Sequence, residues 1–233
     1  MDVILAGLRW TACLVYIDDI VVYSSTLDEH LIRLRSVLGC IRDAGLKLKL
    51  SKCHFVELEL KVLGHVVSQN GVAADPDKLR AVTAFPSPAS ANSDSLRVKQ
   101  LQGFLGLCSY YRRHIPGFAM IARPLTELTK KDTPFVWGPA QEKGFNTLKL
   151  ALSESVVLAY PDYDLPMEIY PDACGYGIGA VLSQKIAGVE RPLAYASRLL
   201  SKTEMNYSIT EKECLALVWA LKKFRSYVWG CQI

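Results

Sequence analysis

The sequence predicts an α+β protein in which strands and helices follow one another in separate blocks. Two short apolar segments, rich in β-branched and aromatic residues, flank the pair Asp18-Asp19 and are typical of buried strands. The middle of the chain has helical periodicity, and the last third predicts three strands followed by a long helix. With 233 residues, of which 50% are apolar, the chain can bury a core in one or two domains.

The first part of the chain predicts a hairpin, a helix and two further strands. Thr26 and Glu29 have the spacing of a capping box at a helix start, and Gly45 is suited to the helix end. The elements expected from these signals are a hairpin at residues 13–24, a helix between Thr26 and Gly45, strands at residues 46–50 and 61–68, and a turn at Asn70-Gly71.

The middle of the chain predicts helices separated by a linker. Asp75 can cap a helix that begins with Pro76. Residues 86–95 are rich in proline and serine, which predicts an exposed linker. The expected helices cover residues 77–85, 96–115 and 119–131, and the second has Leu101, Leu105 and Cys108 on one face.

The last part of the chain predicts strands between two helices. Its expected elements are a helix at residues 141–153, strands at residues 167–170, 177–184 and 192–198, and a helix at residues 208–226. Both Ser208 with Glu211 and Thr210 with Glu213 fit a capping box for the second helix. The residues expected to pack this helix onto the sheet are Leu217, Leu221 and Phe224.

The composition is compatible with a nucleic-acid partner and disfavours several other classes of protein. The formal charge of +4 and the pI of about 8.6 are mildly basic. The seven cysteines include no Cys-x-x-Cys pair, so a zinc site is not expected and a reduced intracellular setting is favoured. No apolar run reaches about eighteen residues, so no membrane partner is expected.

Asp18 and Asp19 have two interpretations. Two carboxylates between apolar strands cost free energy unless water or a cation compensates them. Asp is favoured in turns, so an acidic hairpin tip in water is one interpretation. Mg²⁺ takes hard oxygen ligands and leaves positions open for phosphate, so a metal site is the other. The motifs elsewhere in the chain favour the metal site.

Tyr16-Ile17-Asp18-Asp19, with apolar strands on both sides, resembles the palm signature of reverse transcriptases. Further motifs follow in the order found in gypsy-class LTR retrotransposon Pol polyproteins, namely Gly7-Leu8-Arg9-Trp10, Gly45-Leu46-Lys47-Leu48, Ser51-Lys52-Cys53, Val62-Leu63-Gly64-His65, Phe104-Leu105-Gly106-Leu107 and Tyr110-Tyr111-Arg112-Arg113. Near the C-terminus, the run from Asp172 to Leu182 and the run from Thr210 to Cys214 resemble the ribonuclease H part of the same polyprotein. The resemblance covers essentially the whole chain.

This resemblance implies a fragment with three parts. Residues 1–73 correspond to the C-terminal part of a reverse transcriptase palm. Residues 74–133 correspond to a helical thumb or connection, and residues 134–233 to the N-terminal part of a ribonuclease H-like α/β domain. The implied fold is therefore a partial palm and helical connection followed by a partial ribonuclease H-like domain.

For the polymerase part, the resemblance implies that Asp18 and Asp19 are catalytic and hold Mg²⁺, with Mn²⁺ as a substitute. It implies that Lys52 protonates the leaving pyrophosphate, for which a surface lysine is the alternative. The residues implied to contact nucleic acid are Tyr16, Leu63, Gly64, Arg112 and Arg113. The alternatives are an ordinary hairpin glycine at Gly64 and a solvated helix face for the two arginines.

For the nuclease part, the resemblance implies that Asp172 and Glu213 are catalytic metal ligands. The alternative for Glu213 is a role in a capping box. If both residues share a metal, their carboxyl groups should lie within roughly 8 Å of each other. Pro171 stands where the family usually has a threonine or similar strand residue, and a proline removes one donor from the strand ladder.

The implied function is RNA-directed DNA synthesis coupled to cleavage of RNA in RNA–DNA hybrids. The partners would be an RNA template, a DNA primer, the hybrid and deoxynucleoside triphosphates, in a cytoplasmic retrotransposon particle or the nucleus. The family's third palm aspartate, its fingers and two further nuclease aspartates do not occur in the chain, so we expect little or no catalysis by the chain alone. The alternative is a non-catalytic, nucleic-acid-binding remnant of a decayed element.

Overall fold

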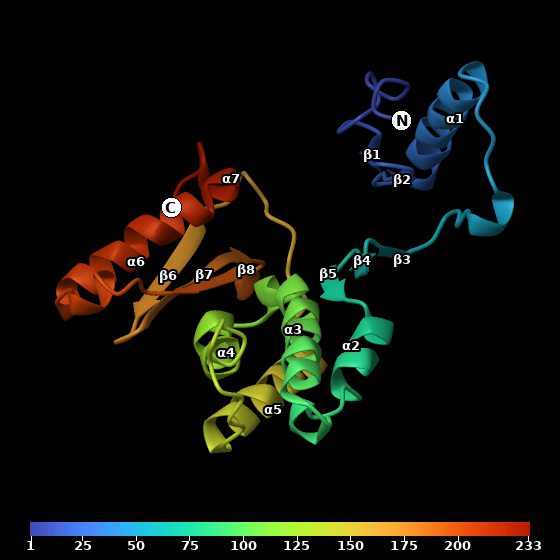
Figure 1. Cartoon of the computed structure of the whole chain (residues 1–233). Coiled ribbons are helices and arrows are strands. Elements are labelled where there is room, and N and C mark those ends of the chain that lie inside the picture. The colour runs from blue at the N-terminus through green and yellow to red at the C-terminus, as the bar shows by residue number, and fades with distance from the viewer. The chain divides into compact units, whose positions relative to one another are not determined.

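The computed structural model describes residues 1–233 and has the mixed α and β content that the sequence predicts. The chain divides into two compact units, Met1–Leu58 and Glu59–Ile233, which are described separately (Figure 1). The boundary lies within the segment 1–73 that the sequence predicts as one part, because the strands after Leu58 pack against later elements. None of the helices has the length and apolar composition that crossing a membrane requires.

The first unit is a hairpin packed on a helix. Strand β1 covers Cys13–Tyr16, strand β2 covers Asp19–Val22, and the two pair antiparallel. Helix α1 covers Leu27–Asp43 and packs against β2. The buried residues of this core are Leu5, Cys13, Val37 and Ile41. The predicted hairpin and helix are confirmed.

The start of α1 contains half of the predicted capping box. The side-chain oxygen of Thr26 accepts a hydrogen bond from the Glu29 N–H at 3.3 Å. The Glu29 carboxylate accepts from the backbone N–H of Ser25 at 3.1 Å, one residue before the expected donor. Both bonds satisfy backbone donors that the beginning of a helix leaves without intrahelical partners.

The strand predicted at residues 46–50 is wrong. Instead, α1 is followed by an irregular segment and a 3₁₀ turn at Leu50–Lys52. Leu46, Leu48 and Leu50 are all exposed. A strand needs a neighbouring strand for its backbone hydrogen bonds, and no strand in the first unit pairs with these residues.

The second unit begins with a three-stranded antiparallel sheet. Strand β3 covers Glu59–Val62, β4 covers His65–Ser68 and β5 covers Gly71–Ala74, in the order β3-β4-β5. The single strand predicted at residues 61–68 is wrong, because the chain reverses at Leu63 and Gly64. The turn signal at Asn70-Gly71 is confirmed, since Ser68 pairs with Gly71 across the next reversal.

Four helices follow this sheet. Helix α2 covers Pro76–Thr83, α3 covers Asp94–Tyr110, α4 covers Phe118–Glu127 and α5 covers Pro139–Ser153. Asp75 caps α2 as predicted, with its carboxylate accepting from the Asp77 N–H at 3.0 Å. The helices bury one core, whose largest residues include Leu101, Phe104, Tyr111, Phe145 and Leu148.

Two predictions in the helical region need correction. The segment 86–95 is not a wholly exposed linker, because Pro88–Ser90 forms a 3₁₀ turn that packs on α3 and buries the apolar ring of Pro88. Helix α3 does not extend to residue 115. It ends at Tyr110, and a separate 3₁₀ turn at Arg112–His114 follows.

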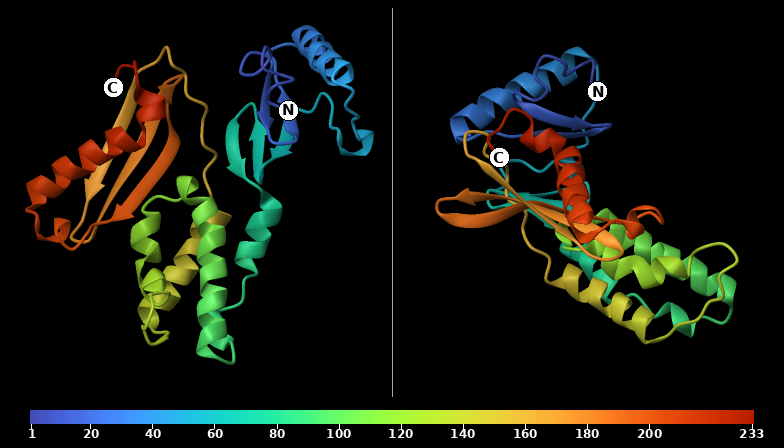
Figure 2. Two further views of the ribbon diagram at one scale, coloured as in Figure 1. Left: turned by 45° about the horizontal axis from the view of Figure 1, so that its top comes forward. Right: turned by 90° about the vertical axis from the view of Figure 1, so that its left-hand side faces the viewer.

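The last part of the second unit is a sheet covered by a helix. Strand β6 covers Met167–Ala173, β7 covers Gly177–Ile186 and β8 covers Val189–Leu199, antiparallel in the order β6-β7-β8. A 3₁₀ turn at Glu204–Asn206 leads to helix α6, Ile209–Lys223, and to the short helix α7, Arg225–Val228. Helix α6 packs on β6 and β7 (Figure 2). The predicted β-β-β-α order is confirmed.

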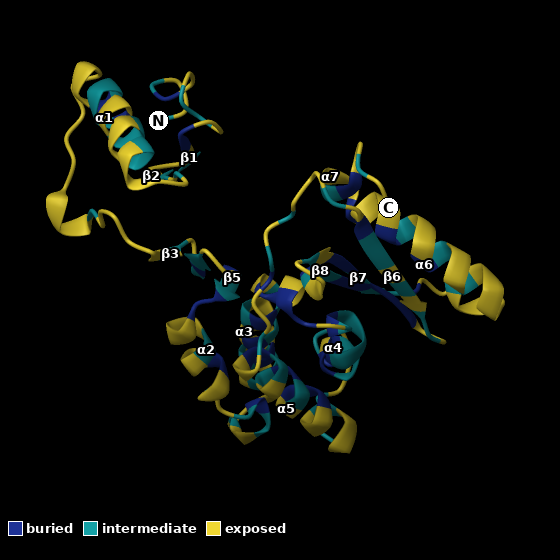
Figure 3. Ribbon diagram, turned by 180° about the vertical axis from the view of Figure 1, so that it is seen from behind, coloured by how far each residue is buried: buried dark blue, intermediate teal, exposed yellow.

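The buried face of α6 differs from the predicted one. Phe224 is buried as expected, but Leu217 and Leu221 are exposed. Ala216 and Ala220 are buried instead, and the opposite side of the helix is exposed (Figure 3). Ala216, Ala220 and Phe224 form a buried stripe at every fourth residue. The two alanines have small side chains, which allow the helix to approach the sheet closely.

We predict unequal effects of truncating Phe224 and Leu217. Phe224 is 3% exposed, so Phe224→Ala should lower the free energy of unfolding by about 3–5 kcal/mol. Leu217 is 45% exposed, so Leu217→Ala should change it by about 0.5 kcal/mol or less. Urea unfolding followed by circular dichroism measures both, and equal losses would contradict the observed helix face.

Candidate active sites

The tip of the β1–β2 hairpin contains the expected polymerase carboxylates. Tyr16 pairs with Asp19, so Ile17 and Asp18 form a two-residue turn. Ile17 has φ = +54°, a left-handed conformation that costs a β-branched residue about 1–2 kcal/mol. The Ile17 side chain is 70% exposed, so packing does not offset this cost. Strain of this kind is found preferentially at functional sites.

Asp18 and Asp19 are both exposed, and neither side chain makes a hydrogen bond or an ion pair within the chain. Glu29, in the same unit, is instead bound to Arg33 and to the Ser25 amide. The two aspartates therefore present free carboxylate oxygens, which are the donors that Mg²⁺ prefers. Tyr16, beside them at the end of β1, is 56% exposed and available for contact.

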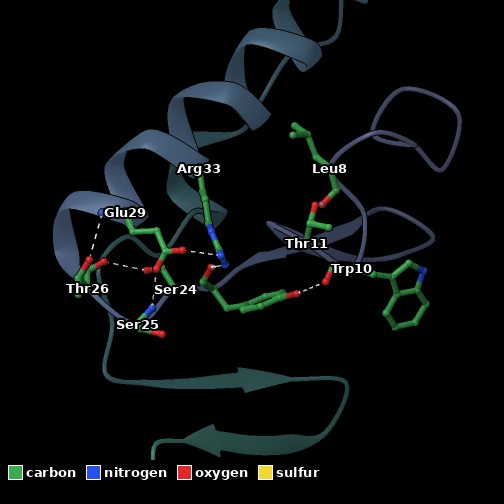
Figure 4. Close-up of polar contacts among 9 residues, drawn as sticks. Leu8, Trp10, Thr11, Ser24, Ser25, Thr26, Glu29 and Arg33 are labelled. Atoms are coloured by element: carbon green, nitrogen blue, oxygen red, sulfur yellow. Dashed lines mark hydrogen bonds and ion pairs between the residues drawn. The ribbon is translucent and has the colours of Figure 1, made fainter.

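The hairpin is fixed to α1 by polar contacts at its opposite end. One terminal nitrogen of Arg33 donates to the Tyr23 carbonyl and the other donates to Glu29, each at 2.6 Å (Figure 4). The Tyr23 hydroxyl donates to the Trp10 carbonyl at 2.5 Å (Figure 4). These bonds link the strand that carries Asp19 to a helix of 17 residues. A strand anchored in this way can hold its carboxylates in a defined geometry.

Lys52 ends the 3₁₀ turn at Leu50–Lys52. Its side chain is exposed and has no ion-pair partner in the chain. The side chain is therefore free to contact a phosphate or solvent. The role of Lys52 stays a prediction.

The β3–β4 turn contains Leu63 and Gly64, both in the left-handed region at φ = +48° and +71°. The Tyr110 hydroxyl donates to the Leu63 carbonyl, and the Tyr111 hydroxyl donates to the Gly64 carbonyl at 2.6 Å. A Cβ added at Gly64 would lie 3.4 Å from the Tyr110 ring. The tyrosines come from the end of α3, so this glycine serves both a turn and a close approach.

Arg112 and Arg113 contact the following sheet and helix. A terminal nitrogen of Arg112 donates to the Ser197 carbonyl of β8 at 2.7 Å. Arg113 donates to the Tyr227 hydroxyl of α7 and lies over the Tyr227 ring, 5.7 Å from its centroid. Both arginines thus join the helical region to the last sheet, and their predicted contacts with phosphate stay predictions.

A cluster of aromatic rings beside the β3–β4 turn was not predicted from the sequence. The His65 ring lies 5.3 Å from that of Tyr110 and 5.7 Å from that of His114 between centroids. His114 is buried, and one ring nitrogen lies 3.2 Å from the Val156 carbonyl. Burial lowers the pKa of His114, although the bond to Val156 opposes this effect. Only the pairing of distant segments could reveal such a cluster.

Asp172 is the next-to-last residue of β6, and it pairs with Gly179 of β7. Pro171, next to it, is tolerated because β6 is an edge strand of this sheet. Ala173 packs toward α6, and side chains alternate along a strand, so Asp172 projects toward the opposite face. Its carboxylate is exposed and makes no hydrogen bond or ion pair.

Glu213 lies on the first turns of α6 and does not cap it. The predicted capping box at Ser208 and Glu211 is confirmed, with the Ser208 N–H donating to Glu211 at 2.8 Å. The alternative box at Thr210 and Glu213 is wrong, which leaves the Glu213 carboxylate without a structural partner. Ala216, one turn later, packs in the same small core as Ala173.

Asp172 is adjacent to Ala173, and Glu213 precedes Ala216 by one turn, so both are near one small core, but Asp172 projects to the face of β6 that is turned away from α6. Glu204, nearby in the sequence, has a different role. Both of its oxygens accept bonds from Arg198, at 2.8 and 2.9 Å, and this interaction lowers the pKa of Glu204 to about 2. The distance between the carboxyl groups of Asp172 and Glu213 stays a prediction.

The two carboxylate pairs fit a magnesium-type ion in the nature of their donors. No group of three or more His, Cys, Asp and Glu side chains in the chain is placed to hold an ion. However, Mg²⁺ is commonly held by one or two protein carboxylates, with water and substrate phosphates as its other ligands. Asp18 and Asp19, at the tip of one hairpin, match that pattern. Asp172 and Glu213 supply the same type of donor from β6 and α6.

Comparison with known proteins assigns the class of both halves. A family model described as reverse transcriptase (RNA-dependent DNA polymerase) matches residues 1–67. A model described as an RNase H-like domain found in reverse transcriptase matches residues 137–233. The hairpin carboxylates lie in the first match, and Asp172 and Glu213 lie in the second.

Similar full-length proteins identify the family more narrowly. The Drosophila melanogaster Pol polyprotein from transposon opus is 42% identical over 229 residues, covering 94% of this chain and 22% of the relative. The Pol polyprotein from transposon gypsy of the same organism is 37% identical over 230 residues, covering 94% of this chain and 21% of the relative. The chain thus spans about a fifth of the length of these relatives.

Solved structures agree with this assignment. A foamy viral protease-reverse transcriptase dRH in complex with double-stranded DNA has a TM-score of 0.84 and 25% identity, and the match covers 98% of this chain and 39% of that one. A foamy viral protease-reverse transcriptase in complex with an RNA/DNA hybrid has a TM-score of 0.80 and 24% identity. This match covers 98% of this chain and 30% of that one, and it supports the fold.

The two halves define a reverse transcriptase segment joined to a ribonuclease H-like segment. The chain belongs to the gypsy-type family of LTR retrotransposon Pol polyproteins, and the resemblance in its motifs is confirmed.

The lowered pKa of His114 predicts a pH dependence of stability. The unfolded chain takes up a proton near pH 6.5 while the buried ring stays neutral, so stability is complete above that pH. It should fall as the pH decreases from about 6.5 through the lower pKa of the folded state. Urea midpoints between pH 7.5 and 4.5 measure this loss.

His114→Asn removes the titrating ring and keeps a donor near Val156, so its urea midpoint should fall less over this pH range. His54, which is exposed, provides the control. His54→Asn should retain the pH dependence of the wild type, and an identical pH dependence in His114→Asn would contradict the assignment.

Proposed function

We propose that this chain is part of an RNA-directed DNA polymerase with an associated nuclease for RNA–DNA hybrids, encoded as a retrotransposon Pol polyprotein. The observation that carries the proposal is the pair of unpartnered carboxylates, Asp18 and Asp19, at the strained tip of a hairpin that is anchored to α1. Its support comes from the reverse transcriptase match over residues 1–67.

In the polymerase reaction, the primer hydroxyl attacks the α-phosphate of an incoming deoxynucleoside triphosphate in line with the leaving pyrophosphate. Mg²⁺ or Mn²⁺, when bound by these carboxylates, supplies charge neutralisation and activates the hydroxyl. Asp18 and Asp19 would hold that ion, and Lys52 would donate a proton to the leaving pyrophosphate. Tyr16, Leu63 and Gly64 contact the nucleic acid.

In the nuclease reaction, a water molecule attacks a phosphodiester phosphorus of the RNA strand, and the phosphorus–oxygen bond on the opposite side breaks, so that the ribose oxygen leaves as a hydroxyl. Asp172 of β6 and Glu213 of α6 contribute carboxylate oxygens. Both side chains are exposed and free of structural bonds, unlike Glu204. Arg112 and Arg113 retain exposed atoms beside the last sheet and can approach the backbone of the hybrid.

The proposed partners are an RNA template, a DNA primer, the RNA–DNA hybrid and deoxynucleoside triphosphates. The proposed location is intracellular, in a cytoplasmic retrotransposon particle or the nucleus. The seven free cysteines, two of them buried, support a reducing setting. The mildly basic charge supports a polyanionic partner.

The polymerase assignment is tested in a longer Pol segment that contains this chain with its flanking regions. Asp18→Asn and Asp19→Asn should each lower primer extension on poly(rA) by about a hundredfold or more, equivalent to roughly 3 kcal/mol. Thermal stability should stay the same or rise, because neighbouring like charges repel each other without metal. Glu57→Gln, which changes an exposed carboxylate of the same unit, is the control.

Extension at the wild-type rate in Asp19→Asn would remove Asp19 from the site. A wild-type segment that binds primer–template but neither extends nor cleaves it would favour the non-catalytic remnant.

The nuclease assignment is tested with a hybrid labelled on its RNA strand. Asp172→Asn and Glu213→Gln should each lower cleavage by about a hundredfold, while primer extension by the same protein remains. Glu154→Gln, at an exposed position after α5, is the control. Cleavage at the wild-type rate in Glu213→Gln would show that its free carboxylate has no part in the reaction.

A further inference from the structure

The Leu63–Gly64 turn is held by an unusual number of bonds to its carbonyl groups. The Leu63 carbonyl accepts a hydrogen bond from the Tyr110 hydroxyl, and one ring nitrogen of His65 lies 3.1 Å from the same carbonyl oxygen. The Gly64 carbonyl accepts hydrogen bonds from the Tyr111 hydroxyl at 2.6 Å and from the Asp75 N–H at 3.2 Å. A short hairpin turn normally leaves such carbonyls to water, so these contacts fix its orientation.

The amide groups of the same turn have no partner. Neither Leu63 N–H nor Gly64 N–H donates a hydrogen bond within the chain. Because the carbonyls are bound on the side of α3, the two amides are left free to donate elsewhere. Leu63 is 42% exposed, so a ligand can reach this turn.

The two tyrosines are well placed to hold the turn. The Tyr111 side chain is 1% exposed and belongs to the core of the helical region, next to Cys108 and Ile115. The Tyr110 ring packs edge-on against it, with 5.0 Å between centroids. Both residues lie 47 positions after their acceptors in the sequence, so the bonds join separate parts of the fold.

We propose that Tyr110 and Tyr111 are positioning residues, which bind the turn carbonyls so that the Leu63 and Gly64 amides donate to a phosphate of the nucleic-acid strand. This rests on the proposed function, which makes the chain's ligand a nucleic acid. Backbone amides commonly bind phosphate oxygens and position a strand without reading its sequence. Asp75, the carboxylate closest to the turn in the bonding network, is paired with Lys61 at 3.3 Å.

The test removes the hydroxyls and keeps the rings. The 233-residue chain and its variant Tyr110→Phe/Tyr111→Phe are titrated with a fluorescent DNA primer annealed to an RNA template, at about 50 mM salt. We expect the double variant to bind about tenfold more weakly and each single variant to be intermediate. Tyr163→Phe is the control, because Tyr163 is 60% exposed and makes no hydrogen bond.

A second measurement separates positioning from a structural role. In ¹⁵N-labelled wild-type chain, saturating primer–template should shift the amide resonances of Leu63 and Gly64. In the double variant those two shifts should be lost at equal saturation, while other shifted amides keep their response. A merely structural role would lower the thermal midpoint and leave the pattern of shifts intact.

Three results would overturn the proposal. The first is an affinity of the double variant equal to that of the wild type. The second is a wild-type chain whose Leu63 and Gly64 amide resonances do not shift with saturating primer–template. The third is a wild-type chain that does not bind primer–template. Failure of the proposed enzymatic function can be distinguished from failure of this positioning role. A longer segment that is inactive in extension and cleavage, with the two amides still shifted by primer–template, would leave the tyrosine contacts as a nucleic-acid-binding device.

Discussion

The packing of Tyr111 between the helical core and the β3–β4 turn is the contact on which the second unit depends. Its ring is buried among core residues of the helices, while its hydroxyl bonds to the Gly64 carbonyl. Arg112 and Arg113 follow directly and bond to the last sheet and to α7. One short segment thus joins three parts of the unit, because each successive side chain points to a different neighbour.

The distribution of charged contacts separates structural acids from candidate functional ones. Glu204 binds Arg198 through both oxygens, and Glu211 caps α6. Asp18, Asp19 and Asp172 have no such bonds, although each lies on or next to a strand that is firmly paired. Carboxylates that are held by rigid backbone but bonded to nothing have lone pairs free for a cation, and the match to reverse transcriptase and ribonuclease H-like families supports that use.

Several elements could be predicted because their signals are local. The hairpin around Asp18-Asp19, the Asp75 cap of α2 and the Ser208 capping box depend on residues a few positions apart. The predicted strand at residues 61–68 failed because a turn with two left-handed residues, Leu63 and Gly64, has a non-glycine at its first position. The prediction that Leu217 and Leu221 pack on the sheet was wrong because leucine is more hydrophobic than alanine, whereas close packing of α6 on the sheet buries Ala216 and Ala220.

The class of protein, the helices, the β-β-β-α order of the last part and the candidate carboxylates can be read from the sequence, since they depend on short motifs and on periodicity. Three findings required the folded chain. Residues 46–50 form no strand, Arg112 and Arg113 bond to Ser197 and Tyr227, and Tyr110 and Tyr111 hold a turn 47 positions away. The physical reason is that a hydrogen bond or a packed face needs a partner in space, and a local pattern does not specify which distant segment supplies it.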